Sequence, residues 1–437
     1  MILDFIWLAL AIVWIVIGTS WLKWHAFWVL LVSVLFMAWA IGTPFPEIPQ
    51  LIAQGFGNTF SQIGLLILFG SIIGVILEKS GATLSIAQFL IHRLSAKYPL
   101  LVMNLLGFLV AIPVFCDAAF VVLSSLNKKL AVTTGKSLTA FSVALATGLY
   151  ATHVLVPPTP GPLAVAATFE MENIFLLFIY GGFFAFIISL LGWAFASYLA
   201  QHPQYQYSSN DLPPSNEIKI PKILPSTISS LMPILIPVML MALGTIGPFL
   251  GRPYDWLSFI AHPTIALLAG LIAALLIKNA PKDALQQGIA QAAPILFITA
   301  MGGALGGVLK TMSFAEVLES IEMSATLFLL VPFLIAAGLK TAQGSSTVAM
   351  ITTASIVFPM LANAGIHSEV DKIWVILATG IGAMTVSHAN DSYFWIVSQL
   401  GKIDLKTAYK THTLSTLIQG GLGILILMIC YFFSLNT

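Results

Sequence analysis

Long apolar runs recur along the chain and are separated by shorter polar or charged stretches. A helix of about 20 apolar residues is long enough to cross the hydrocarbon core of a membrane. Runs that approach or exceed this length are residues 2–22, 26–41, 61–77, 173–199, 227–250, 256–277, 292–309 and 413–435. Between them, 44–57 is predicted to be interfacial, and 78–98 and 278–291 to be amphipathic helices. The pattern predicts an all-α polytopic membrane protein.

Two further apolar runs, 138–168 and 374–395, contain residues that cannot remain helical. Residues 151–162 read Ala-Thr-His-Val-Leu-Val-Pro-Pro-Thr-Pro-Gly-Pro, and proline both lacks the helical N–H and extends the residue before it. Residues 385–391 read Thr-Val-Ser-His-Ala-Asn-Asp and are followed by Ser-Tyr-Phe-Trp. Broken backbone at membrane depth is tolerated where it is buried in protein or lines a cavity. Paired breaks in two halves are typical of a transporter's substrate site.

Two pairs of short apolar arms predict re-entrant hairpins. An arm rises only about 1.5 Å per residue, so neither member of a pair is long enough to cross the membrane alone. The first hairpin is predicted at about 99–127, with its tip at 113–117. The second is predicted at about 327–359, with Lys-Thr-Ala-Gln-Gly-Ser-Ser at 340–346 as its tip.

Three features recur at nearly the same interval, which predicts an internal duplication. The intervals are 232, 229 and 235 residues for, in turn, the matching segments 70–77 and 302–309, the tips at Cys116 and Ser345, and the pair His153 and His388. We therefore expect a first repeat at 1–200, a linker at 201–226 and a second repeat at 227–437.

Basic residues are distributed unevenly between the predicted loops. With both termini outside and the linker inside, 14 of the 18 basic residues fall on cytoplasmic segments, and the others are Arg252, Lys310, Lys340 and Lys372. Cytoplasmic loops carry an excess of lysine and arginine, so we expect periplasmic termini. Each half then has five full crossings and one hairpin, and an odd number inverts the second repeat. The first hairpin would enter from the cytoplasm and the second from outside, which suits alternating access.

Composition agrees with a membrane protein and narrows the possible functions. The 437 residues are 58% hydrophobic and 8% charged, with a mean hydropathy of +0.97, whereas soluble domains carry about 25% charged residues. The net charge of +1 includes no basic patch for nucleic acid. Cys116 and Cys430 lie in apolar segments and indicate neither a disulfide framework nor a metal site. We expect residues 1–22 to be a retained helix, because they lack the basic start and cleavage site of a signal peptide.

Asp117, at the first hairpin tip, is the leading candidate for proton coupling. A carboxylate at membrane depth is costly unless it is neutral, paired or hydrated, and such groups usually serve function. The alternative is a structural carboxylate that caps the returning arm. Ser346, which stands 229 residues further along at the second tip, cannot titrate.

The second break offers His388, Asn390 and Asp391 together. Asp391 is a second candidate for proton coupling, and it could equally cap the helix at 392–400. His388 and Asn390 are candidates for substrate contact, as is His153 in the first break. A lone buried histidine is often a satisfied core residue, but the equivalent positions of these two histidines favour the substrate.

Small and hydroxyl-bearing residues precede the helices that follow the second tip and the first break. Free N–H groups at a helix N-terminus can hold a substrate carboxylate, whereas close helix packing would explain small residues equally well. The substrate-binding candidates of this kind are Gly344, Ser345, Ser346, Thr347, Thr159 and Gly161. Lys340 could attract an anion or extend toward the interface.

These stretches resemble the gluconate permease family, the gluconate:proton symporters of bacteria, within the wider ion-transporter superfamily. The resemblance covers essentially the whole chain and is strongest at 152–162, at 344–352 (Gly-Ser-Ser-Thr-Val-Ala-Met-Ile-Thr), and at 387–391 with Phe394 and Trp395. It implies uptake of sugar acids or related hydroxy acids with protons across the inner membrane. Relatives in the superfamily suggest paired hairpins, a scaffold part, a mobile transport part and often a homodimer.

The sequence departs from the family pattern at three positions. Family members usually have histidine where Thr159 stands, glutamate where Asp117 stands and glycine where Val154 stands. A shorter acid and a missing imidazole change the pocket. A smaller hydroxy acid such as glycerate therefore competes with gluconate as the expected substrate.

The leading interpretation is a secondary active transporter that imports a small hydroxy-carboxylate with protons and needs no metal or other cofactor. A sodium-coupled carboxylate carrier is the alternative within transport, and the Ser/Thr/Asn-rich tips favour it. An intramembrane enzyme could use Asp117, Asp391 and the histidines as acids and bases, but the chain has neither an HExxH nor a GxSxG motif. A passive channel could also contain re-entrant hairpins, and saturable, uphill uptake would exclude it.

Overall fold

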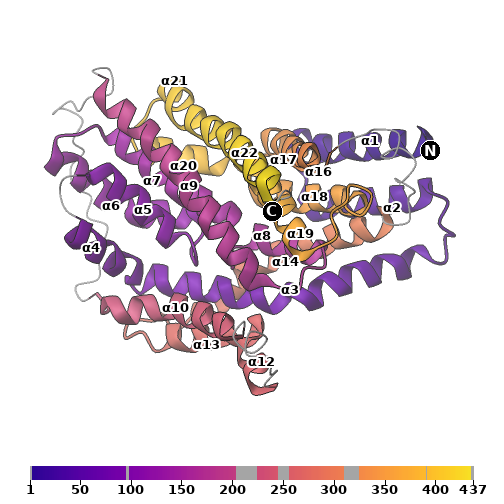
Figure 1. Cartoon of the computed structure of the whole chain (residues 1–437), viewed down its shortest axis with the longest axis horizontal. Helices are drawn as coiled ribbons and strands as arrows, with labels where there is room; N and C mark the ends of the chain where they lie inside the picture. The colour runs from indigo at the N-terminus through magenta and orange to yellow at the C-terminus, as the bar shows by residue number, and fades with distance from the viewer. Residues whose placement is uncertain are drawn as a thin grey trace.

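The computed structural model describes residues 2–94, 98–202, 224–244, 255–309, 324–389 and 391–434, and the regular elements in these ranges are helices (Figure 1). A helix satisfies its backbone hydrogen bonds internally, which is a requirement in lipid. The all-α class predicted from the apolar runs is confirmed.

The helices of the first half follow one another through short connections. They are α1 (Ile2–Val16), the π-turn η1 (Ile17–Trp21), α2 (Ala26–Ala40), α3 (Ile48–Lys79), α4 (Ala82–Leu94), α5 (Pro99–Val110), α6 (Cys116–Thr134), α7 (Leu138–Leu155), α8 (Pro160–Thr168) and α9 (Ile174–Gln201). The first hairpin, α5 and α6, extends beyond the expected residue 127. It ends where Gly135 adopts a left-handed conformation, with φ +64°.

The second half repeats this order of elements. Its helices are α10 (Thr227–Gly244), α12 (Asp255–Ala261), α13 (Pro263–Leu275), α14 (Ala284–Leu309), α16 (Ala325–Phe328), α17 (Leu330–Gln343), α18 (Ser346–Val357), the 3-10 turn η4 (Phe358–Met360), α19 (Glu369–Met384), α20 (Ser392–Leu400), α21 (Leu405–Ala408), the π-turn η5 (Tyr409–Thr413) and α22 (Leu414–Ser434). Gly344, with φ +77°, ends the first arm of the second hairpin, and Ser345 caps the second arm.

Within the described residues, seven helical stretches are long and apolar enough to cross a membrane. They are α3, α7 with α8, α9, α10, α14, α16 with α17, and α21 with α22. The helices α12 and α13 meet at 59° and together would make an eighth span. The chain is therefore a multi-pass membrane protein.

Two expected polar segments are instead the first turns of the long helices α3 and α14. The interfacial segment expected at 44–57 becomes helical at Ile48, and the amphipathic segment expected at 278–291 joins α14 at Ala284. The two helices pack closely on each other, and a Cβ added to Gly303 would lie only 1.9 Å from the Thr59 hydroxyl. The packing between them, which no local pattern records, extends both helices.

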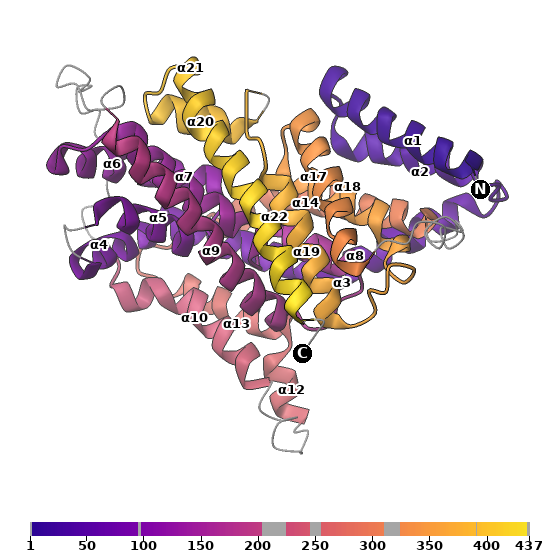
Figure 2. The ribbon, with the colours of Figure 1, turned by 45° about the horizontal axis from the view of Figure 1, so that its top comes forward.

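Helices of each half pack on the other half in a reciprocal way. α2 packs on α14 while α13 packs on α3, and α8 packs on α18 while α20 packs on α6. In Figures 1 and 2, α10, α12 and α13 lie at the bottom and α1 and α2 at the right, with the hairpins and broken helices between them. This exchange is what two inverted repeats produce, each with a hairpin and a broken helix. The repeat boundaries stay a prediction, and most of the linker, 203–223, lies outside the described residues.

Candidate functional site

The two broken helices meet next to the first break. Residues 156–159 separate α7 from α8, and residues 385–391 separate α19 from α20. A Cβ on Gly380 of α19 would lie 2.4 Å from the Val154 carbonyl oxygen of α7, so only glycine allows this approach. The contact places both breaks in the same part of the protein.

The first hairpin tip contacts the second break through Asp117. Asp117 lies in the first turn of α6, and the Ser392 hydroxyl at the start of α20 donates to its Oδ2 at 3.2 Å. The Cys116 thiol donates to Oδ1 at 3.7 Å. Asp117 also lies within electrostatic range of Asp391 and Lys340. The carboxylate predicted at the tip therefore belongs to the same cluster as the second break.

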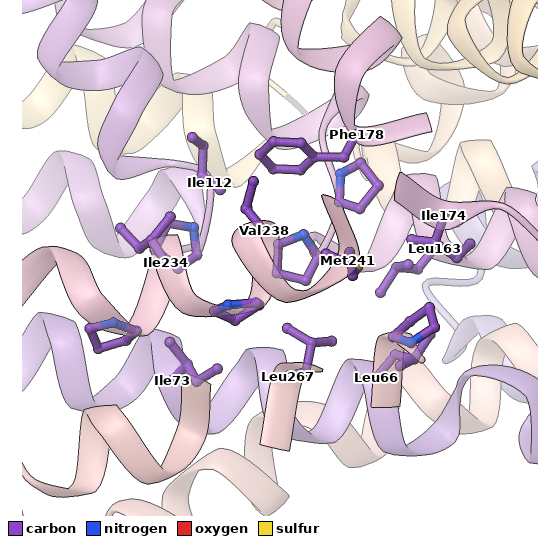
Figure 3. A pocket seen from close by; sticks show the side chains of 16 residues that line it. Leu66, Ile73, Ile112, Leu163, Ile174, Phe178, Ile234, Val238, Met241 and Leu267 are labelled. Atoms are coloured by element: carbon purple, nitrogen blue, oxygen red, sulfur yellow. The ribbon is translucent and has the colours of Figure 1, made fainter. Parts of the chain in front are cut away.

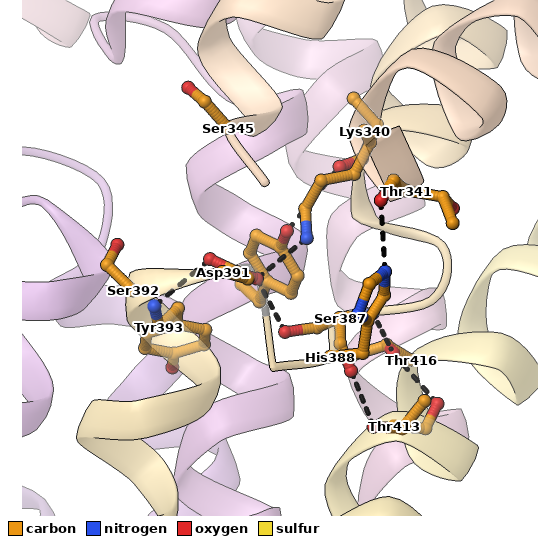
Figure 4. Close-up of polar contacts among 12 residues, drawn as sticks. Lys340, Thr341, Ser345, Ser387, His388, Asp391, Ser392, Tyr393, Thr413 and Thr416 are labelled. Carbon is orange, nitrogen blue, oxygen red and sulfur yellow. Dashed lines mark hydrogen bonds and ion pairs between the residues drawn. The ribbon is translucent and has the colours of Figure 1, made fainter. Parts of the chain in front are cut away.

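A buried ion pair joins the second hairpin to the second break. Lys340 Nζ, on α17, lies 2.7 Å from Asp391 Oδ2, and Lys340 is fully buried while Asp391 is 4% exposed (Figure 4). Lys340 therefore does not extend to the interface. Charges removed from water are costly unless they are paired and hydrogen-bonded, and this pair meets both conditions.

Asp391 accepts further hydrogen bonds that fix its position. Its Oδ1 accepts the Tyr393 N–H at 3.0 Å and so caps α20, and its Oδ2 accepts the Ser387 hydroxyl at 2.6 Å. The capping role considered for Asp391 is thus present in the structure. With Lys340 beside it, the carboxylate is surrounded by donors that stabilise its ionised form.

Two tyrosines form an aromatic wall beside the ion pair. Tyr150 of α7 and Tyr393 of α20 have ring centroids 5.2 Å apart, and Lys340 Nζ lies 5.9 Å from the Tyr150 centroid. The Tyr393 hydroxyl donates to the Ala146 carbonyl at 3.0 Å. The first broken helix thereby supplies one side of the cluster.

The two histidines predicted to be equivalent lie against equivalent hairpins. The His153 ring centroid is 5.9 Å from that of Phe115 at the first tip. His388 Nε2 donates to the Thr341 carbonyl of the second hairpin at 3.0 Å. His153 is 6% exposed, and its Nδ1 has no hydrogen-bond partner among the described residues. Asn390, the third candidate of this kind, lies outside the described residues.

The hydroxyls at the second tip have different surroundings. Ser345 Oγ accepts the Val348 N–H at 3.3 Å, and the side chain points away from Lys340 and Asp391 in Figure 4. Ser346 is hydrogen-bonded to Tyr150, so it faces the aromatic wall. Thr347 is half-buried. Ser346 is therefore the tip hydroxyl with a described contact to the central cluster.

The candidates at the first break are packed against neighbouring elements. The Thr159 hydroxyl donates to the Val156 carbonyl within the break. A Cβ on Gly161 would lie 2.7 Å from Met350 Sδ of α18, so this glycine serves the contact between α8 and the second hairpin. Thr159 and Ser71 also border a cavity of about 230 Å³ at the first tip.

A larger pocket behind this cavity is almost entirely apolar. It has an empty volume of about 490 Å³ and lies between the first tip, the first break, α10 and α13 (Figure 3). The residues that line it are Leu66, Ile73, Ile112, Pro113, Pro157, Pro158, Leu163, Ile174, Phe178, Pro233, Ile234, Pro237, Val238, Met241, Pro263 and Leu267. None carries a side-chain donor or a charge, so this pocket is unsuited to a carboxylate.

Sequence reasoning did not select Tyr150, Ser387 or His412, all of which contact the cluster. Tyr150 precedes the first break and Ser387 lies inside the second, so proximity to the breaks could have indicated both. His412 stands 25 residues from Ser387, and its Nε2 lies 3.1 Å from the Ser387 hydroxyl. No sequence signal near His412 indicates this contact.

Known proteins resemble the chain over nearly its whole length. The family described as GntP family permease matches residues 3–433, so the resemblance found in the motifs is confirmed. The gluconate permease of Pseudomonas aeruginosa is 30% identical over 93% of both chains, and the D-serine transporter DsdX of Escherichia coli O6:H1 is 30% identical over 94% of both. The solved structure of Neisseria gonorrhoeae MtrF, titled as illuminating a class of antimetabolite efflux pumps, has a TM-score of 0.70 at 15% identity and covers 95% of this chain and 96% of its own. That likeness shows the fold alone.

The ion pair yields a stability prediction. Lys340→Met should lower the free energy of unfolding by about 3–5 kcal/mol, because it leaves the Asp391 carboxylate buried without its partner. Lys340→Met combined with Asp391→Asn should recover most of the loss, since asparagine still caps a helix. Thermal unfolding of the purified variants in detergent measures both effects.

The matched control is Lys372→Met. Lys372 lies 3.0 Å from Glu369 in a partly exposed pair, so its loss should cost at most about 1 kcal/mol. Wild-type stability of Lys340→Met, or a double variant less stable than Lys340→Met, would contradict the assigned role of the pair.

Proposed function

Because the chain belongs to the GntP family of permeases and is therefore a multi-pass inner-membrane transporter rather than an enzyme, we propose that it imports a small hydroxy-carboxylate with protons. Alternating access around one central site would carry both across the membrane. The observation that carries this proposal is Asp117, an acid at the first tip whose described hydrogen bonds come from the uncharged groups of Ser392 and Cys116.

The substrate class rests on what two relatives are named for and on the chemistry of the site. Gluconate and D-serine each combine a carboxylate with at least one hydroxyl, and the two relatives are named for these compounds. The start of α18 offers N–H groups at Ser346 and Thr347, and a helix N-terminus favours an anion. Tyr150 and Ser346 add hydroxyls beside it. A gluconate-like or glycerate-like acid would use both kinds of group.

The charge balance of the cluster supports coupling through Asp117. Lys340 and Asp391 neutralise each other, which leaves Asp117 as the remaining charge among these three. An ionised Asp117 would repel a substrate carboxylate, and a protonated Asp117 would not. Proton and anion would therefore bind cooperatively. Import of an anion alone would also cost about 2.3 kcal/mol per 100 mV of inside-negative potential, and the proton offsets this cost.

A second candidate substrate follows from the same carboxylate. An ionised Asp117 could pair with the ammonium group of a hydroxy-amino acid such as D-serine, the compound for which one relative is named. Sodium is the alternative coupling ion. Uptake in sodium-free medium separates the two ions, and competition between gluconate, glycerate and D-serine separates the substrates.

Uptake by the purified protein in sodium-free proteoliposomes tests the proposal. With an acidic exterior, the wild-type protein should concentrate a labelled hydroxy acid, and Asp117→Asn should bind it without concentrating it, because the amide mimics the protonated acid but cannot release a proton. Glu47→Gln, at an exposed acid, is the control and should behave as wild type. Uphill uptake by Asp117→Asn would transfer the coupling role to Asp391 or a histidine, and uptake that requires sodium would reject proton coupling.

Orientation is part of the proposal and can be tested separately. The distribution of basic residues supports periplasmic termini and a cytoplasmic linker at 201–226. Single cysteines placed in this linker, in a Cys430→Ser background, should react with a membrane-impermeant maleimide only after cells are permeabilised. Reaction in intact cells would reverse the topology.

A further inference from the structure

Ser387 in the second break lies between Asp391 and His412. Its hydroxyl is 2.6 Å from Asp391 Oδ2 and 3.1 Å from His412 Nε2. His412 is fully buried and belongs to η5, a single π-helical turn ahead of α22. Single π-turns within helices occur frequently at functional sites.

The proton positions in this chain of contacts follow from its two ends. Asp391 is paired with Lys340 and can only accept, so the Ser387 hydroxyl proton points to Asp391. The Ser387 oxygen then accepts from His412, which must carry a proton on Nε2. His412 Nδ1 finds no hydrogen-bond partner in the described part of the chain, and a second proton there would be a buried donor without a partner. The arrangement therefore fits the neutral imidazole.

The same π-turn holds the backbone of Ser387. Thr413 Oγ1 donates to the Ser387 carbonyl at 2.6 Å, and the Thr416 hydroxyl accepts the Ser387 N–H at 3.0 Å (Figure 4). The closing helix of the first half, α9, is α-helical throughout Ile174–Gln201. The π-turn and its histidine thus belong to the second break alone, where the cap is an aspartate. In the first break, the corresponding N-cap is Thr159.

We propose that His412 is a positioning residue that orients the Ser387 hydroxyl toward Asp391 and so keeps Asp391 ionised during transport. With Lys340 and Ser387 both donating, Asp391 does not take the coupling proton, and Asp117 titrates alone. The inference rests on the proposed proton-coupled transport and identifies the device that restricts coupling to one of the two carboxylates.

The groups around His412 set the expected pH behaviour. Asp391 and Lys340 act on it electrostatically from the second break and α17. The Tyr393 ring of α20 lies 5.6 Å away and the Phe394 ring 6.1 Å away. Without the donor from His412, Ser387 can turn from Asp391, and the carboxylate can bind a proton itself. The transporter would then have two proton sites in place of one.

Two substitutions separate positioning from proton carrying. His412→Gln keeps a donor near the Nε2 position and cannot titrate, whereas His412→Leu removes the donor. In proteoliposomes, His412→Leu should slow proton-driven uptake about tenfold, the effect of one lost buried hydrogen bond, and move the midpoint of the pH profile about one unit toward higher pH. His412→Gln should keep the wild-type midpoint and most of the rate. His367→Leu, at an exposed histidine, is the control.

A double-mutant cycle on the same pair needs no substrate. If His412 acts through Ser387, then His412→Leu with Ser387→Ala should melt at the same temperature as Ser387→Ala alone. Additive losses would overturn the proposal, as would a His412→Gln variant as defective as His412→Leu. Should His412→Leu fail to fold, Ser387→Ala should reproduce the pH shift and His412→Gln should not. Absence of uptake by wild type would reject the proposed function, while the melting cycle would still decide the positioning role.

Discussion

The ion pair between Lys340 and Asp391 is the interaction on which the site depends. It is buried at 2.7 Å, and it joins the second hairpin to the second break. Asp391 also caps α20 through the Tyr393 N–H, and α20 presents Ser392 to Asp117 at the first tip. One carboxylate therefore links the second hairpin, the second broken helix and, through α20, the first hairpin. A buried pair of this kind is a weak source of net stability but a strong constraint on geometry.

The duplication supplies the framework, and unequal side chains supply the function. Each half contributes a hairpin and a broken helix, and each outer half-helix packs on the hairpin of the other repeat. The chemistry at equivalent positions differs, because α8 is capped by Thr159 and α20 by Asp391. At the tips, the second residue of α6 is Asp117 and that of α18 is Thr347. Titratable and paired groups are thus distributed unequally around a symmetric scaffold.

Breaks and hairpin tips could be predicted from the sequence because proline and glycine disrupt helices locally. The observed break at 156–159 falls within the predicted 151–162, and Gly344 ends its helix as expected of a tip. Contacts between distant residues could not be predicted in this way. Lys340 and Asp391 are 51 residues apart, and only tertiary packing decides whether that lysine extends to the interface or forms a pair. The same holds for His412, which the π-turn η5 directs toward Ser387.

The central claim is that substrate anion and proton bind together, with Asp117 as the proton site. Calorimetric titration of the purified protein with its hydroxy acid, in buffers of different ionisation enthalpy, measures protons taken up on binding directly. The account predicts uptake of up to about one proton per substrate at a pH where Asp117 is ionised, and none for Asp117→Asn. Binding without proton uptake by the wild-type protein across its pH range, or undiminished uptake by Asp117→Asn, would contradict it.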